Sequence, residues 1–212
     1  MAIDRHYIFD KVNFFLKKEN KFFTSSELHM AIGVDSFRRI GEELNYPKTN
    51  YSSIIASGEY QISTPSDFIK IDQNHELTVE LSSTIYTLEP KTSKLIGRQN
   101  ILDPTNAIPQ NYYMETESLI GLYPPGNTSM IVVIPYVKYA TALSSDTDTN
   151  ELTENCYMAA VYWTVGECML KDNDERFATY MQLYDREILR LKSKYGEMFE
   201  EDKDLMPDDR YL

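Results

Sequence analysis

Residue types that commonly hold metals or perform catalysis are few in this sequence and form no known motif. The three histidines, His6, His29 and His75, lie far apart along the chain. No HExxH, CxxC, GxSxG, Walker or GxGxxG pattern occurs. Acids that are adjacent in the sequence, such as Glu42 and Glu43, point apart on a helix and cannot act as a catalytic pair. We therefore expect no catalytic site, no metal site and no cofactor, and we expect that the protein is not an enzyme.

The two cysteines, Cys156 and Cys168, are expected on one helix. Twelve residues of helix separate them by about 18 Å, whereas a disulfide needs Cα atoms within about 7 Å. An intramolecular disulfide is therefore excluded, and both residues are expected to be small buried apolar groups. This usage is typical of a protein made in a reducing cytoplasm.

The charge balance excludes tight binding to nucleic acid. The chain has 33 acidic and 21 basic residues, which give a formal net charge of −12. Nucleic-acid binding depends on Lys and Arg that neutralise phosphates, so an acidic chain repels DNA. The longest uncharged run, residues 118–137, contains three prolines and predicts turns and strands, so we expect no membrane span and see no targeting signal.

Helical periodicity predicts helices at both ends of the chain. Apolar residues recur at helical spacing in four segments, and Thr24 with Glu27 forms a capping-box signature. The helices are expected at residues 4–19, 24–45, 151–170 and 173–199. The segment 151–170 is apolar on most sides, which predicts a buried helix.

The middle of the chain, residues 46–143, has short alternating runs typical of β-strands. A β-hairpin is expected at residues 118–139, because two β-rich runs flank a turn rich in Pro and Gly. Shorter strands are expected at residues 58–62, 68–71 and 77–81, and residues 91–106 are left unassigned. The predicted class is α+β. We expect a single domain over residues 1–212: a bundle of the N-terminal helices (1–45) and the C-terminal helix pair (151–199), with an inserted antiparallel β-rich region.

Two features near the C-terminus are candidates for contacts with other chains. Apolar residues spaced alternately by four and three form a continuous seam on the last helix, which packs either on this chain or on another subunit. The seam consists of Phe177, Met181, Tyr184, Ile188, Leu191, Tyr195 and Met198. The acidic tail, residues 200–212, has the composition of a solvated segment, yet it contains Leu205, Met206, Tyr211 and Leu212.

A series of short motifs occurs in a characteristic order along residues 20–195. They are Gly58-x-Tyr60, Pro65-x-Asp67-Phe68, Gly121-Leu122-Tyr123-Pro124-Pro125, Tyr136-x-x-Tyr139, Leu143-Ser144-Ser145-Asp146-Thr147-Asp148, Leu152, and Ala159-Ala160-Val161-Tyr162. Each motif is short and not specific by itself, so the resemblance depends on the order of the motifs along the chain. In this order the chain resembles the head-to-tail adaptor proteins of tailed bacteriophages.

The resemblance implies a virion structural protein of the tail or neck. It implies a homo-oligomeric ring, usually of twelve copies, that docks on the portal protein and contacts other tail or ring proteins. DNA would pass through the channel without specific binding, which agrees with the negative charge. Candidate partner-binding residues are those of the turn, Pro124, Pro125, Gly126 and Asn127, and the four apolar residues of the tail. The family carries no catalytic residues.

Two other function classes remain open on the sequence alone. One is a small accessory enzyme, carbohydrate-active or nuclease-like, whose site is built from scattered acids. The other is a soluble protein-binding module with a regulatory role. A metal or substrate effect on the melting curve would indicate the enzyme, whereas assembly with a portal would indicate the adaptor.

Overall fold

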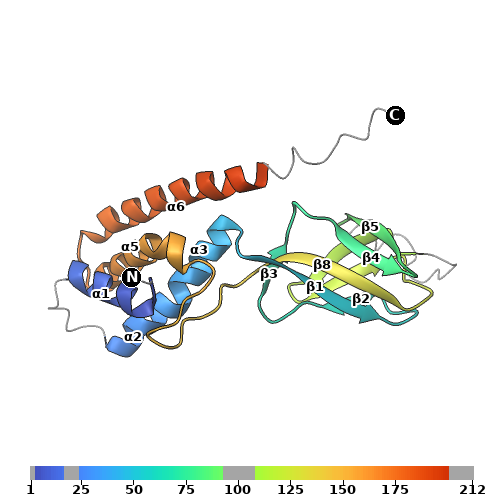
Figure 1. The fold of residues 1–212 in the computed structure, drawn as a ribbon, viewed down its shortest axis with the longest axis horizontal. Helices are drawn as coiled ribbons and strands as arrows, with labels where there is room; N and C mark the ends of the chain where they lie inside the picture. Colours follow the sequence, from blue (N-terminus) through green and yellow to red (C-terminus); the bar gives the residue numbers. More distant parts are fainter. Residues whose placement is uncertain (1–2, 17–23, 93–107, 201–212) are drawn as a thin grey trace. The chain divides into compact units, whose positions relative to one another are not determined.

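The computed structural model describes residues 3–16, 24–92 and 108–200, without the side chains of Ser25 and residues 195–200. Its contacts divide the chain into two compact units. Met1–Pro47 and Ala140–Leu212 form a helical unit, and Lys48–Tyr139 forms a unit of β-strands (Figure 1). The predicted α+β class is therefore confirmed.

The helical unit draws its helices from both ends of the chain. They are α1 (Arg5–Phe15), α2 (Ser25–Met30), the π-helical segment η1 (Ala31–Ser36), α3 (Phe37–Leu44), α5 (Thr153–Lys171) and α6 (Phe177–Glu200). Asp4 begins α1, because its side chain accepts a hydrogen bond from the Tyr7 backbone N–H at 2.8 Å. The capping box of Thr24 and Glu27 is confirmed at the start of α2. The single helix expected over residues 24–45 is thus three consecutive helical segments.

The core of the helical unit is built around α5. This helix is buried on most sides, as its apolar sequence predicted, and α1, η1, α3 and α6 pack against it. Cys156 and Cys168 are buried and are not joined by a disulfide, as expected. The side chains that are fully buried there include Ile8, Val12, Ile32, Ile40, Leu152, Val161, Val165, Tyr184 and Leu191.

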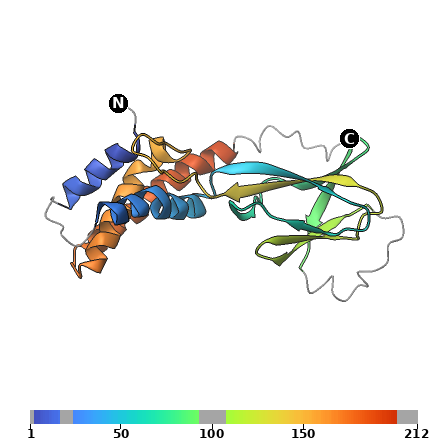
Figure 2. The ribbon, with the colours of Figure 1, turned by 90° about the horizontal axis from the view of Figure 1, so that it is seen from below.

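The β unit is one large sheet that is nearly closed (Figure 2). Its strands are β1 (Lys48–Ile55), β2 (Gln61–Ser63), β3 (Phe68–Ile71), β4 (Leu77–Leu81), β5 (Thr84–Pro90), β6 (Asn111–Thr116), β7 (Leu119–Tyr123) and β8 (Met130–Lys138). Their order is β1-β8-β4-β5-β6-β7-β2, with β3 also paired to β8. All pairs are antiparallel except a short parallel contact between β5 and β6. The residues left unassigned at 91–106 lie almost entirely outside the described residues.

The hairpin predicted at residues 118–139 is wrong. Strands form at both expected places, but β7 pairs with β2 and β6, whereas β8 pairs with β1, β3 and β4. The turn between them therefore connects two parts of the sheet instead of two adjacent strands. Pro124 and Pro125 have no backbone N–H, so hydrogen-bonded pairing cannot continue through this turn as it does in a tight hairpin.

Candidate partner-binding surfaces

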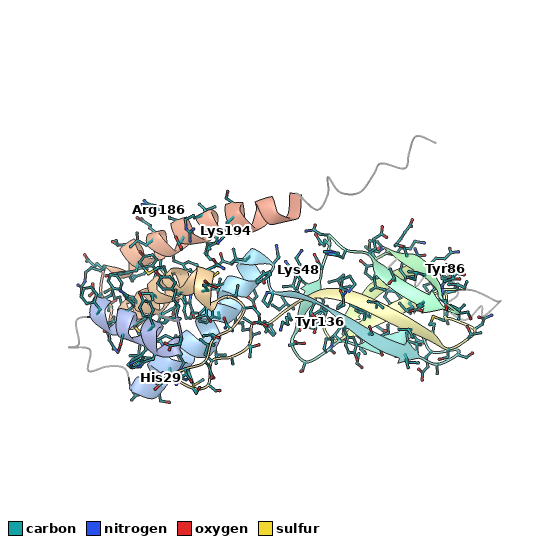
Figure 3. The ribbon with its side chains drawn as sticks, in the orientation of Figure 1. His29, Lys48, Tyr86, Tyr136, Arg186 and Lys194 are labelled. Atoms are coloured by element: carbon teal, nitrogen blue, oxygen red, sulfur yellow. The ribbon has the colours of Figure 1, made fainter. Side chains whose placement is uncertain are left out.

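Two of the motifs meet in the β unit. The hydroxyl of Tyr136 donates a hydrogen bond to Asp67 Oδ1 at 2.9 Å, and the backbone N–H of Tyr139 donates to the Asp67 carbonyl at 2.8 Å. The Phe68 ring stacks on the Tyr136 ring with their centroids 5.6 Å apart. Burial, together with the Asp67 carboxylate, raises the pKa of Tyr136 to about 12, so the phenol stays a hydrogen-bond donor at all physiological pH values. These contacts between motif residues connect β3 to β8 (Tyr136 is labelled in Figure 3).

The Leu143–Asp148 motif folds into a loop that is tied by its own carboxylate. Asp148 accepts hydrogen bonds from the backbone N–H and hydroxyl groups of both Ser144 and Ser145. Hydrogen bonds from Ser145, and then those from Ser144, lower the pKa of Asp148 far below its ordinary value. The loop is therefore held in one shape at neutral pH by a charged acceptor.

Arg5 of α1 fastens this loop to the helical unit. Its guanidinium donates to the carbonyl oxygens of Leu143 and Ser144 at 3.1 and 2.9 Å, and to Asp146 Oδ1 at 2.7 Å. Leu143 is buried, and its N–H donates to the carbonyl of Gly33 at 3.0 Å. A Cβ atom at Gly33 would lie 2.5 Å from the Leu143 carbonyl oxygen, so glycine is required for this approach. The sequence contained the loop motif, but it gave no signal that Arg5 would bind it.

The seam on α6 faces the helical core over its described part. Tyr184, Ile188 and Leu191 are buried, and Phe177 and Met181 are half-buried. The Tyr184 hydroxyl also donates to Glu43 Oε1 of α3 at 3.0 Å, and burial followed by the Glu43 charge raises the pKa of that phenol. The side chains of Tyr195 and Met198 lie outside the described residues.

The turn proposed for partner binding, Pro124–Asn127, is hydrogen-bonded to the loop between β1 and β2. Gly126 is buried and its carbonyl accepts from Gly58 N–H at 2.8 Å, and the carbonyl of Asn127 accepts from the Ser57 hydroxyl at 2.7 Å. Pro124 and Pro125 are half-buried, and Asn127 is exposed. The four tail candidates, Leu205, Met206, Tyr211 and Leu212, lie outside the described residues.

A buried charge cluster that sequence reasoning missed lies beside Pro135. Asp72 is 5% exposed and accepts hydrogen bonds from Lys48 Nζ at 2.9 Å, His75 Nδ1 at 2.7 Å and the Asn74 N–H at 3.2 Å (Lys48 is labelled in Figure 3). Burial raises the pKa of Asp72, but these hydrogen bonds outweigh it and leave the pKa below its ordinary value. The cluster joins the start of β1 to the end of β3.

An exposed apolar row crosses the outer face of the sheet. Ile54 pairs with Ile131, Ile131 with Glu80, and Glu80 with Ile85, so the four side chains share one face. The three isoleucines are 74%, 39% and 68% exposed, in that order. Since they lie on three different strands, no local pattern in the sequence predicted the row.

Two classes of site were searched for in the part of the chain that the structure describes. Among residues 3–16, 24–92 and 108–200, no three His, Cys, Asp or Glu side chains come close enough together to ligate a metal ion. Over the same residues, no helix combines the length and the apolar character needed to cross a membrane.

The structure is that of an α+β protein. Its sequence motifs form contacts within the chain, and the apolar side chains of Ile54, Ile85 and Ile131 are exposed to solvent. A family model described as SU10 adaptor protein matches residues 34–204, which is most of the 212 residues. The chain therefore belongs to the SU10 adaptor protein family. This is a family of structural, non-enzymatic phage proteins, so the chain is a virion adaptor that contacts other head or tail proteins. No curated protein matches the chain.

Proposed function

We propose that this protein is a head-to-tail adaptor that forms a homo-oligomeric ring between the portal and the tail of a bacteriophage and lines the channel for DNA. The observation that carries the proposal is the family match over residues 34–204, which includes every motif from the first strand region to the last helix. In this proposal the helices from both chain ends form one bundle, and the β-rich region is inserted into it. The ring has twelve copies, as the resemblance to head-to-tail adaptors implies, and the protein is made in the host cytoplasm.

The charge of the chain supports a role as a conduit. Each copy carries a formal net charge of −12, and a ring of copies places this charge around one channel. A negative wall does not retain a negative polymer, because the phosphates find no Lys or Arg excess to displace their counterions. DNA would therefore pass through without specific binding.

The proposed contacts with the portal and with neighbouring tail or ring proteins are the Pro124–Asn127 turn and the acidic tail. Support for the turn is the exposed side chain of Asn127, whose backbone carbonyl is held by the Ser57 hydroxyl of the loop between β1 and β2. Support for the tail is its composition, because apolar residues among acids can bury only against a partner. Each of Leu205, Met206, Tyr211 and Leu212 would then contribute about 1–2 kcal/mol, and repetition around a ring would add to the attachment.

The direct test is reconstitution with tailless heads of the same phage. Purified protein should co-sediment with heads that carry a portal, and electron microscopy should show a ring at the portal vertex. Heads that lack the portal are the control and should not bind. A protein that stays in the supernatant with portal-bearing heads, and that forms no ring on them, would contradict the proposal.

A second test addresses the tail. A chain ending at Phe199 should fold with an unchanged melting temperature and should bind portal-bearing heads more weakly than the full chain. A variant with Leu205, Met206, Tyr211 and Leu212 changed to Ser keeps the tail charge and should show the same loss. Full retention of binding by both would remove the tail from the attachment and leave the turn.

A further inference from the structure

The exposed apolar row of Ile54, Ile131, Glu80 and Ile85 has one carboxylate inside it. Glu80 of β4 lies between Ile131 of β8 and Ile85 of β5. It is half-buried, and in the part of the chain that the structure describes no side chain forms an ion pair or a hydrogen bond with its carboxylate. The row therefore matches a partner surface in which an apolar side chain lies beside a base.

The rest of this face is acidic over β4 and β5. Side chains alternate between the two faces of a strand, so Thr87 and Glu89 share the face of Ile85. Glu76, which precedes β4, lies on the same face, because Thr87 Oγ1 donates a hydrogen bond to its carboxylate at 2.8 Å. Neither β4 nor β5 contains a Lys or Arg residue. The row thus lies on a surface that attracts bases and repels acids.

The row lies away from the residues of this unit that the structure does not describe, 93–107. The chain leaves the described residues just after β5 ends at Pro90 and re-enters them just before Asn111, which pairs with Glu89. Both ends of the gap are therefore at the Pro90 end of β5. Ile85 is at the opposite end of this strand, about 16 Å away along it.

A surface of opposite charge with one exposed apolar residue lies on α6. Leu189 is 67% exposed, and Arg186 and Lys192 lie exposed three positions to either side of it (Arg186 is labelled in Figure 3). Asp185 is an acid four positions before Leu189, yet residues 185–194 hold four bases and two acids, within a chain whose net charge is −12. This outer side of α6 therefore combines the apolar and basic groups that the row lacks.

We infer that the exposed apolar row of one copy binds the outer side of α6 of the next copy in the ring. Leu189 would cover the isoleucines of the row, and Arg186 or Lys192 would pair with Glu80. Each of the two surfaces lies within one unit of the chain. This inference rests on the proposed function, since it specifies the contact between neighbouring copies of the ring.

The symmetry of a ring favours this pairing of two different surfaces. A cyclic ring joins one surface of each copy to a different surface of the next, so the two surfaces must complement each other. A two-fold contact of the row with itself would instead set Glu80 against a second carboxylate or against isoleucine, with no base to pair with it.

The contact is too small to hold two copies together in solution. Four apolar side chains and one or two ion pairs bury far less than the roughly 1,200–2,000 Å² of a stable interface. Copies that are already held side by side on a portal lose much less freedom when they touch, so the same contact can close a ring there. The free protein is therefore expected to be monomeric.

The experiment reverses the charge of each surface in a separate full-length chain. The sheet variant is Glu80→Arg, and the helix variant is Arg186→Glu with Lys192→Glu. Each alone sets like charges against each other at every contact, so ring formation on portal-bearing heads should need about tenfold more protein or fail. Glu117→Arg is the matched control, because Glu117 is exposed in the turn between β6 and β7 and its reversal changes the net charge equally. It should form rings as the wild type does.

An equimolar mixture of the two variants is the decisive measurement. In a ring where the variants alternate, the reversed row meets the reversed helix and the unchanged row meets the unchanged helix, so every contact again joins opposite charges. The mixture should therefore restore ring formation, as seen by electron microscopy and co-sedimentation. Melting curves of each variant should match the wild type, because the substituted side chains are exposed or half-buried.

The other outcomes are distinct. Normal rings from each variant alone would overturn the inference and leave the proposed function standing. Loss in the sheet variant without restoration in the mixture would make the occupant another head or tail protein and would overturn the assignment to a second copy. Restoration only when all three substitutions are in one chain would place the contact within a single copy and would also overturn it. Wild-type protein that does not bind portal-bearing heads would contradict the proposed function and the inference with it.

Discussion

Replacing Tyr184 tests whether the α6 seam belongs to the core of this chain or to an interface with another subunit. Tyr184 is fully buried, and its hydroxyl bonds to Glu43 of α3. Three variants separate the contributions: Tyr184→Ala removes the ring, Tyr184→Phe removes only the hydroxyl, and Leu189→Ala changes an exposed residue of the same helix. Leu189 is 67% exposed, so it controls for truncation of a large side chain on α6.

The expected losses follow from burial. Truncation of a fully buried aromatic side chain leaves a cavity and should lower the free energy of unfolding by about 3–5 kcal/mol. Loss of the hydroxyl alone should cost about 1 kcal/mol, because Glu43 keeps its ion pair with Arg39 at 3.1 Å. Truncation of Leu189 should change the free energy by less than about 0.5 kcal/mol.

Urea unfolding followed by tryptophan fluorescence measures these losses of free energy for the helical unit. Trp163 is the only tryptophan of the chain, lies on α5 and packs against the helical core, so its emission reports on the helical unit. A loss below about 1 kcal/mol for Tyr184→Ala would refute the assignment of this residue to the core. If the same variant then failed to form rings, the seam would belong to a subunit interface.

Three further outcomes are expected. Gly121→Ala should destabilise the β unit by about 1–3 kcal/mol, because the new Cβ would overlap Cζ of Tyr113. In urea titrations of the double variant with Tyr113→Ala, the loss of unfolding free energy should be smaller than the sum of the two single losses. Asp72→Asn should cost about 2–3 kcal/mol at pH 7, because Lys48 loses its buried partner. The pKa of Asp72 in the folded protein lies below its ordinary 3.8, so the stabilisation is present above pH 3.8 and is lost as the pH falls through the lower, folded pKa. The difference in unfolding free energy between wild type and Asp72→Asn should therefore narrow below about pH 4 in acid titrations followed by circular dichroism. Arg5→Ala should speed limited proteolysis within residues 140–150, and Arg5→Lys should not restore protection, because one ammonium cannot bond three oxygens in the geometry of the guanidinium.

The helices were predictable because their signals are local. The capping box of Thr24 and Glu27 and the all-round apolar character of residues 151–170 both act within a few turns of one helix. Asp172 and Glu175 have the same capping-box spacing in the sequence, but no helix begins at Asp172. In the structure α5 ends at Lys171, with Asp172 as its C-cap, and α6 begins at Phe177, because Asn173 adopts a left-handed conformation with φ of 57°.

The sheet was less predictable, because its pairings join residues far apart in the sequence. β1 was missed because Tyr51 is the only apolar residue among its first six and its partner is the distant β8. A proline within a strand usually marks a bulge or an edge, yet Pro135 lies in β8, which has neighbouring strands on both edges. It stands where the neighbour changes from β4 to β3, and the Asp72 N–H donates to its carbonyl at 2.9 Å, so the missing N–H interrupts no ladder on that side.

The motifs of the family resemblance explain the fold better than they explain the partners. Inside the β unit Tyr136 hydrogen-bonds to Asp67 and its ring stacks on Phe68. The Leu143–Asp148 loop forms hydrogen bonds within itself and with Arg5. These groups are satisfied within the chain, so they leave little for a partner to bind. Partner choice must then depend on residues that the motifs do not include. Two adaptors could therefore share every motif and the same fold and still dock to different head and tail proteins.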